Sequence, residues 1–256
     1  MVRKFNLQSV CLLLFLLSYN FCFSQSDKFS LGIKAGISIP NLKASGDNPV
    51  SKGWASSLGP YAGVIAGLKF SERFSLQAEL NYSSQGGKKN GKQAIATSGF
   101  AEYIPPGTTV PPYVYANYND EVKLNYIELP ILAKFNFTIN DMVSFFISGG
   151  LYCGYLVNAK NVTSGSSNIY FDENLTHPFL PSAISFDQTS DIKSDLKKIN
   201  YGIQGGVGFD LKISDKSKII ITAGGNYGLV KIQKDKSNGE NNTGAATVTL
   251  GYIIQL

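Results

Sequence analysis

Residues 199–213 read INYGIQGGVGFDLKI, a stretch that alternates between two kinds of side chain. One parity, from Ile199 to Ile213, is apolar apart from Gly205, whereas the other parity carries glycine, amides and charge. Because strand side chains point alternately to opposite faces, this pattern predicts one long, two-faced β-strand. A tilted strand needs about 9–11 residues to cross a bilayer, so the stretch is typical of a membrane-spanning β-barrel with its apolar face toward lipid. The alternative, a water-soluble barrel of lipocalin type, would need an apolar interior.

Similar alternation recurs along the chain and predicts eight strands. They cover residues 29–39, 58–70, 74–85, 122–137, 143–157, 199–213, 218–232 and 244–256. Three of the predicted connections are tight turns, at residues 71–73, 138–142 and 214–217. The other four are long: residues 40–57, 86–121, 158–198 and 233–243. This alternation is typical of outer-membrane barrels with short periplasmic turns and long outer loops. We therefore predict an all-β fold: a transmembrane eight-stranded antiparallel up-and-down β-barrel, formed by residues 25–256 as a single domain.

The first 24 residues have the features of a secretory signal peptide. Arg3 and Lys4 precede an apolar run over residues 10–17, which is too short to span a membrane as a helix. We expect cleavage after Ser24. The alternative is a lipoprotein cut before Cys22, although the residues ahead of Cys22 are not small. Either cut implies export, so we expect the protein in the bacterial outer membrane.

Composition narrows the classes of partner. Removing the signal peptide would lower the net charge from +5 to +3, too small and too scattered a charge to indicate nucleic-acid binding. It would also leave Cys153 as the single cysteine, so no intramolecular disulfide could form. Stability would then have to come from elsewhere, and a closed, hydrogen-bonded barrel supplies it.

Two short motifs connect the chain to a known group of proteins. The first predicted strand contains GIKAG at residues 32–36, and the fourth contains YIELP at residues 126–130. Together with the glycine-rich sixth strand and the closing strand, they resemble the porin-family outer-membrane β-barrel proteins of Bacteroidetes, which include PorT-like proteins. The resemblance covers essentially the whole chain after the signal peptide. It implies an integral outer-membrane barrel of about the size of OmpA or OmpX, but no particular activity. PorT-like members are associated with protein secretion, and no motif in this sequence selects that role.

Five charged residues fall on the inward parities of the predicted strands. An unpaired buried charge costs several kcal/mol, so we expect these residues to pair as ions that fill the lumen and fix strand register. A proton or ion site is the alternative interpretation. The five residues of this lumen charge cluster are Lys34, Glu79, Glu128, Lys134 and Asp210. Nearby, Pro130 lies inside a predicted strand, where it removes one hydrogen bond of the ladder, and it predicts a bulge or kink near Leu129.

The second long connection has the composition of a recognition surface. Tyrosines offer amphipathic contact area at low entropy cost, and prolines stiffen the segment. The alternative is a segment that packs its aromatic residues onto the rim of the barrel. The tyrosines of this candidate recognition loop are Tyr103, Tyr113, Tyr115 and Tyr118.

These features predict a non-enzymatic surface or assembly protein with a filled lumen. Its expected partners are outer-membrane lipid or lipopolysaccharide, and envelope or surface proteins that meet the outer loops. A small-solute porin is the first alternative, and an outer-rim hydrolase or acyltransferase is the second. We expect no catalytic residues, no cofactor and no metal, because the sole histidine, His177, has no second histidine or nearby cysteine to complete a metal site.

Overall fold

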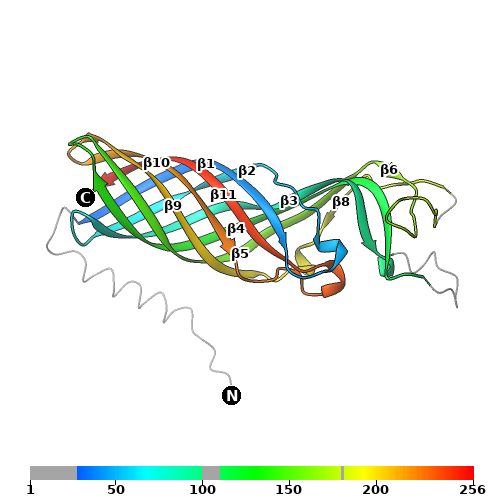
Figure 1. The fold of residues 1–256 in the computed structure, drawn as a ribbon. Helices are drawn as coiled ribbons and strands as arrows, with labels where there is room; N and C mark the ends of the chain where they lie inside the picture. The colour runs from blue at the N-terminus through cyan, green and yellow to red at the C-terminus, as the bar shows by residue number, and fades with distance from the viewer. Residues whose placement is uncertain (1–27, 100–109, 180–181) are drawn as a thin grey trace, which may run out of the picture.

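The computed structural model describes residues 28–99, 110–179 and 182–256, drawn in colour in Figure 1. The predicted signal peptide and Tyr103 lie outside these residues. Within the described part of the chain, no α-helix is long and apolar enough to cross a membrane.

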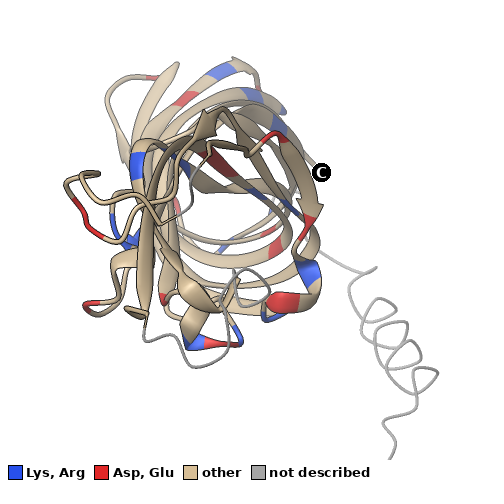
Figure 2. Cartoon of the chain, turned by 90° about the vertical axis from the view of Figure 1, so that its right-hand side faces the viewer, with Lys and Arg blue, Asp and Glu red and all other residues tan. Residues whose placement is uncertain are grey.

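Eight long antiparallel strands close into a ring, which confirms the predicted fold class. The order is β4–β3–β2–β1–β11–β10–β9–β5, and a further pairing of β4 with β5 closes the ring. Figure 2 shows this closure in a view from one end of the barrel. The strands are β1 (Phe29–Ala44), β2 (Gly59–Lys69), β3 (Phe74–Ala96), β4 (Tyr113–Thr138), β5 (Val143–Ser164), β9 (Ile199–Ser214), β10 (Ser217–Gly228) and β11 (Asn241–Gln255).

Short turns join the strands at the end of the barrel where the C-terminus lies (Figure 1). Polar side chains shape two of them. The Ser71 hydroxyl accepts from the amide of Phe74, and the Asn140 side chain accepts from the amides of Met142 and Val143. Such side-chain-to-backbone bonds are the reason serine and asparagine favour turns. The predicted turns therefore stand.

Long connections lie at the opposite end, which we call the outer end. They contain the short strands β6 (Ser166–Ser167), β7 (Ile184–Ser185) and β8 (Gln188–Asp191). They also contain the 3-10 turns η1 (Pro49–Ser51), η3 (Lys193–Asp195) and η4 (Lys236–Asn238). β8 pairs with residues 160–163, near the end of β5. It is the ninth strand of the sheet and lies outside the ring.

The connection 86–121 is the largest departure from the prediction. Instead of a loop, most of it is strand, because β3 continues to Ala96 and β4 begins at Tyr113, with pairing from Gly86↔Lys123 to Ala96↔Tyr113. β5 likewise runs on to Ser164. This hairpin projects beyond the barrel at the outer end (Figure 1). We call the projecting residues 88–96, 113–121 and 158–164, together with residues 165–179 and 182–191, the outer platform.

The outward faces of the strands are apolar. Along β9, the outward parity that the sequence predicted is exposed at Ile199, Tyr201, Ile203, Val207 and Phe209. Aromatic rings gather at the edge of this band near the short turns, as they do at the interface of a membrane. Near the short turns the rings touch one another over several strands. These rings are Phe70, Phe74 and Phe135, with centroids 5.6 and 5.0 Å apart, and Phe137, Phe145 and Phe209, with centroids 6.2 and 5.6 Å apart.

Size complementarity fixes how β5 meets β9 inside the ring. Tyr152 pairs with Gly202 and Phe146 pairs with Gly208. A Cβ atom at Gly208 would lie 2.6 Å from the Phe146 ring, and one at Gly202 would lie 2.9 Å from the Tyr152 ring. Each large inward ring of β5 therefore occupies the space that a glycine leaves on β9.

Pro130 does not cause the predicted bulge. The register between β3 and β4 is the same on both sides of it, with Ala78↔Ile131 and Asn81↔Glu128, although the two pairs between them are missing from the ladder. The two strands therefore lose hydrogen bonding at Pro130, but neither strand contains an extra residue there. A register shift does occur between β4 and β5, at Asn125/Tyr126, where Val157 of β5 is left without a partner in the ladder.

Candidate functional site in the lumen and at the outer mouth

Near the short turns the lumen contains an ion triplet. Lys134 Nζ on β4 lies 2.8 Å from Asp210 Oδ1 on β9, and Lys218 Nζ on β10 lies 2.6 Å from Asp210 Oδ2. The Lys134 ammonium also lies 3.8 Å from the centre of the Phe146 ring, a cation–π contact. One carboxylate thus neutralises part of the charge of two lysines, and it links three strands across the interior.

A second ion pair lies further along the lumen. Lys34 Nζ on β1 is 2.6 Å from Glu79 Oε2 on β3, and both side chains are buried. Asn81 Nδ2 donates to the same carboxylate at 2.8 Å and to the Tyr61 hydroxyl at 2.8 Å. A cavity of about 30 Å³ lies beside this pair, and its volume is comparable to that of one water molecule. The side chains therefore fill this level of the barrel.

Glu128 departs from the expected pairing. Its side chain is buried, with 1% of the residue exposed, yet no described lysine, arginine or histidine nitrogen lies within 4.0 Å of it. Amides surround it instead. Gln85 Nε2 lies 3.3 Å from its Oε1 and Asn226 Nδ2 lies 3.2 Å from its Oε2. The lumen charge cluster is thus two ion-paired groups, around Glu79 and Asp210, and one amide-solvated carboxylate.

An apolar layer crosses the lumen on the outer side of Glu128. From Glu128 toward the outer end, the inward positions of β4 are Tyr126, Leu124 and Val122, and all three are buried. Other strands and two of the long connections supply the rest of the layer. Its buried members are Leu42, Val122, Leu124, Tyr126, Leu156, Ala159, Leu196 and Ile232. In the sequence, this layer is signalled only by the inward parity of Leu124, Tyr126 and Leu156.

Two of these apolar side chains come from connections that fold inward over the mouth. Leu196, after η3, and Ile232, after β10, lie on backbone segments that bond to each other. The Lys197 amide donates to the Ile232 carbonyl at 2.8 Å, and the Lys234 amide donates to the Asp195 carbonyl at 2.9 Å. The outer end of the lumen is therefore closed by a hydrogen-bonded cover whose underside is apolar.

The described tyrosines of the candidate recognition loop are only partly available at the surface. Val114, Ala116 and Ile169 form a small buried core inside the outer platform, with Tyr118 packed against it. The Tyr118 ring stacks on Phe186 with centroids 4.1 Å apart. Burial, followed by the nearby carboxylate of Asp120, raises the pKa of the Tyr118 phenol above its ordinary range.

Tyr113 and Tyr115 are half-buried in the same platform. The Tyr115 amide donates to the Tyr170 carbonyl at 2.8 Å, and the Tyr170 amide donates to the Tyr115 carbonyl at 2.8 Å. These backbone bonds attach the connection that follows β5 to the projecting hairpin. The outer platform is therefore a small folded unit, and tyrosine rings contribute to its packing.

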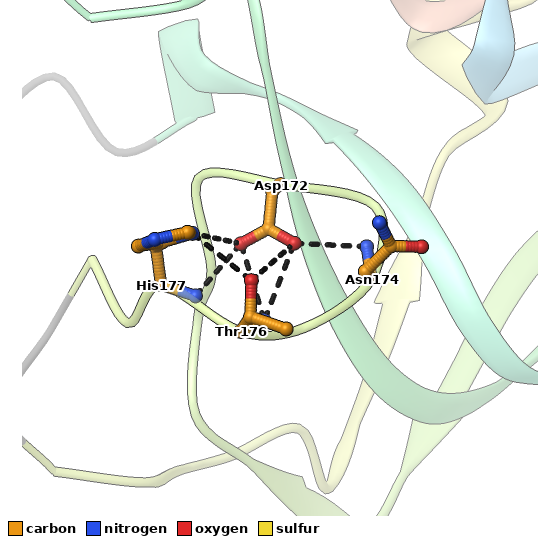
Figure 3. Close-up of polar contacts among 4 residues, drawn as sticks. All are labelled: Asp172, Asn174, Thr176 and His177. Carbon is orange, nitrogen blue, oxygen red and sulfur yellow. Dashed lines mark hydrogen bonds and ion pairs between the residues drawn. The ribbon is translucent and has the colours of Figure 1, made fainter.

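His177 lies in an exposed turn of the outer platform, where Asp172 accepts most of the hydrogen bonds (Figure 3). Asp172 accepts from the amides of Asn174, Thr176 and His177, from the Thr176 hydroxyl and from His177 Nδ1 at 3.2 Å. Partial burial acts to raise its pKa, but these hydrogen bonds outweigh that effect and hold the pKa of Asp172 at about 2. Thr176 and Asp172 both meet the same ring nitrogen, so this geometry is that of a fixed turn and not of a nucleophile–histidine–carboxylate relay.

A closed antiparallel ring with an apolar exterior and a polar, side-chain-filled interior defines a membrane-spanning β-barrel. Residues 23–234 match the family model described as outer membrane protein beta-barrel domain, and the chain belongs to this family. The family places the protein in a bacterial outer membrane. No curated protein matches the chain.

Solved outer-membrane barrels share only a distant likeness with the chain. The Neisserial surface protein A is 15% identical, with a TM-score of 0.40 over 89% of this chain and 97% of that one. Ail, the attachment invasion locus protein of Yersinia pestis, is 13% identical, with a TM-score of 0.38 over 89% and 99%. The N-terminal barrel of Pseudomonas aeruginosa OprF is 12% identical, with a TM-score of 0.39 over 90% and 98%. At these values no property of those proteins is carried over to this one.

Proposed function

We propose that this protein is a non-enzymatic component of the outer-membrane surface that acts through its outer platform. The observation that carries the proposal is the apolar layer across the lumen, which closes the barrel between the ion pairs and the outer mouth. With the lumen filled, the remaining large feature is the outer platform, a folded unit on the side of the long connections. Its partners would be lipopolysaccharide or an envelope protein, and the resemblance to PorT-like Bacteroidetes proteins supports a role in the cell envelope.

Transport of small solutes is the alternative, and the interior argues against it. An eight-stranded barrel has an interior just wide enough for side chains, whereas porins form an aqueous channel with about 16–18 strands. Here Lys34, Glu79, Phe146 and Tyr152 all project inward and are buried. At the level of these residues, side chains fill the axis of the barrel.

We therefore expect no stable conductance from the purified full-length protein. The measurement is planar-bilayer recording combined with liposome swelling in a small sugar. Adding bulk at Gly206, which lines the luminal cavity of about 30 Å³ beside Lys34 and Glu79, serves as the comparison variant. Long-lived conductance steps that this variant abolishes would overturn the filled-lumen proposal and favour the transport alternative.

The orientation of the barrel has its own test. In a Cys153→Ala background, we expect a cysteine at Asn174 in the outer platform to react with a membrane-impermeant maleimide on intact cells. A cysteine at Asp215, in the β9–β10 turn at the other end, should react only after the cells are broken. Asn174 and Asp215 are both exposed, so the side of the membrane on which each lies determines whether the reagent reaches it. Labelling at Asp215 alone on intact cells would invert the proposed orientation.

A further inference from the structure

A cavity of about 460 Å³ lies at the outer mouth, directly above the apolar layer. Its volume is within the range of small-molecule sites, about 300–1,000 Å³. Residues of β1, the β1–β2 connection, the β3–β4 hairpin, β5, β11 and the two inward-folding connections of the cover line it. Apolar side chains form much of its wall, namely Leu42, Trp54, Val122, Ile192, Leu196 and Ile232.

One cation is held in this cavity with little neutralisation. Lys89 is 6% exposed; its Nζ donates to the Val50 carbonyl oxygen at 2.6 Å and lies 4.4 Å from the centre of the Trp54 ring. No described carboxylate lies within 4.0 Å of that nitrogen. Asp120, its partner in strand register, accepts instead from the side-chain amide of Asn161. Lys89 lies on β3 beyond the part of the strand whose outward face is apolar. Burial lowers the pKa of Lys89 to about 8, and the nearby carboxylate of Asp120 partly offsets this effect.

The cavity also has an unused hydrogen-bond donor. The indole Nε1 of Trp54 is buried and has no acceptor among the described residues. A lysine ammonium carries three N–H donors, of which the Val50 carbonyl accepts one. A buried donor without a partner costs free energy, so both groups favour an occupant that supplies acceptor oxygens. The apolar walls favour an occupant whose remainder is hydrocarbon.

We propose that this outer-mouth cavity binds a small amphipathic anion: a carboxylate on an apolar body about the size of a short acyl chain. The Lys89 ammonium and the Trp54 indole N–H bind the carboxylate oxygens. The apolar body lies against Leu42, Leu196 and Ile232. Lys89 belongs to the outer platform, but the cavity lies between the platform and the cover, and its failure would leave the proposed action of the platform's outer surface standing.

The position of Trp54 supplies a direct assay, because it is the single tryptophan of the chain. The full-length protein is reconstituted in nanodiscs and titrated with 8-bromooctanoate, whose bromine quenches tryptophan fluorescence on contact. We expect saturable quenching that unbrominated octanoate reverses by competition. The neutral analogue 8-bromooctan-1-ol should bind about tenfold more weakly, since it lacks the charge-assisted hydrogen bonds.

The matched variants are Lys89→Met and Lys88→Met, which remove neighbouring lysines that are buried and exposed respectively. Each is first shown to fold by its heat-modifiable mobility on a gel. Lys89→Met should weaken 8-bromooctanoate binding about tenfold and erase its advantage over the alcohol, whereas Lys88→Met should stay within about twofold of the parent. Unsaturable quenching, equal binding of acid and alcohol to the parent protein, or equal effects of the two substitutions would overturn the proposal. The acid–alcohol comparison remains decisive even if Lys89→Met does not fold.

Discussion

Replacing Glu79 with glutamine is expected to lower the free energy of unfolding by about 3–5 kcal/mol, because it leaves Lys34 buried without its counter-ion. The 2.6 Å contact between Lys34 Nζ and Glu79 Oε2 is the only ion pair of Lys34 within the described residues. Glutamine preserves the size of the side chain, so the loss reports charge and not packing. Urea unfolding in lipid vesicles, followed by Trp54 fluorescence, measures the change.

The double substitution Lys34→Met/Glu79→Gln is the control. Removing both charges takes away the buried, uncompensated ammonium, and buried ion pairs are often replaceable by apolar groups at little cost. The double variant should therefore recover most of the stability that Glu79→Gln loses. An equal loss in both variants would show that the carboxylate acts through its hydrogen bond with Asn81 and not through the ion pair.

Val207→Arg is expected to cost about 2–4 kcal/mol, the cost of an arginine on the lipid face near the bilayer midplane. Val207 is 43% exposed and lies on β9 between the outward rings of Tyr201 and Phe209, so its side chain faces lipid. The comparison variant, Gln204→Ser, changes an inward position of the same strand. Folding titrations in lipid vesicles measure both variants. Equal losses at the two sites would contradict the assigned facing of β9.

The sequence was sufficient for the ring and for the facing of its strands. Period-two alternation assigned Val207 and Phe209 to the outer face and Asp210 to the lumen, and the structure has them there. Phe146 and Tyr152 likewise lie inside, on the parity of β5 that faces the lumen. This success has a physical basis, since lipid on one side and a narrow interior on the other leave each strand residue only two environments.

Pairing across the lumen could not be predicted in the same way. Which inward residues meet depends on the stagger of the strands, and a sequence read strand by strand does not contain it. Lys34 forms an ion pair with Glu79, whereas Glu128 accepts hydrogen bonds from the side-chain amides of Gln85 and Asn226. The apolar layer was hidden for a related reason. Leu196 lies in a predicted connection, and Ile232 was predicted to end the strand 218–232, whereas β10 ends at Gly228. Only the fold of the cover turns both side chains inward.

The projecting hairpin was hidden by composition. Residues 86–96 are rich in glycine, lysine and polar residues, and the segment around Tyr113 is rich in tyrosine and proline, which are signals of a connection. The structure nevertheless extends β3 and β4 through them, with both strands paired over this length. Packing in the outer platform, through Val114, Ala116 and Ile169, supports strand in a region where local preference does not.

The match between large rings on β5 and glycines on β9 has a consequence for how the barrel is assembled. A slip of two residues keeps every side chain on its proper face, so the inside–outside pattern alone cannot reject it. Such a slip would move Phe146 opposite Asp210 or Gly206 and Tyr152 opposite Gln204 or Asn200. At least one ring would then face a side chain instead of the space above a glycine. Contacts between these two strands therefore favour the native register over a two-residue slip, in addition to the inside–outside pattern.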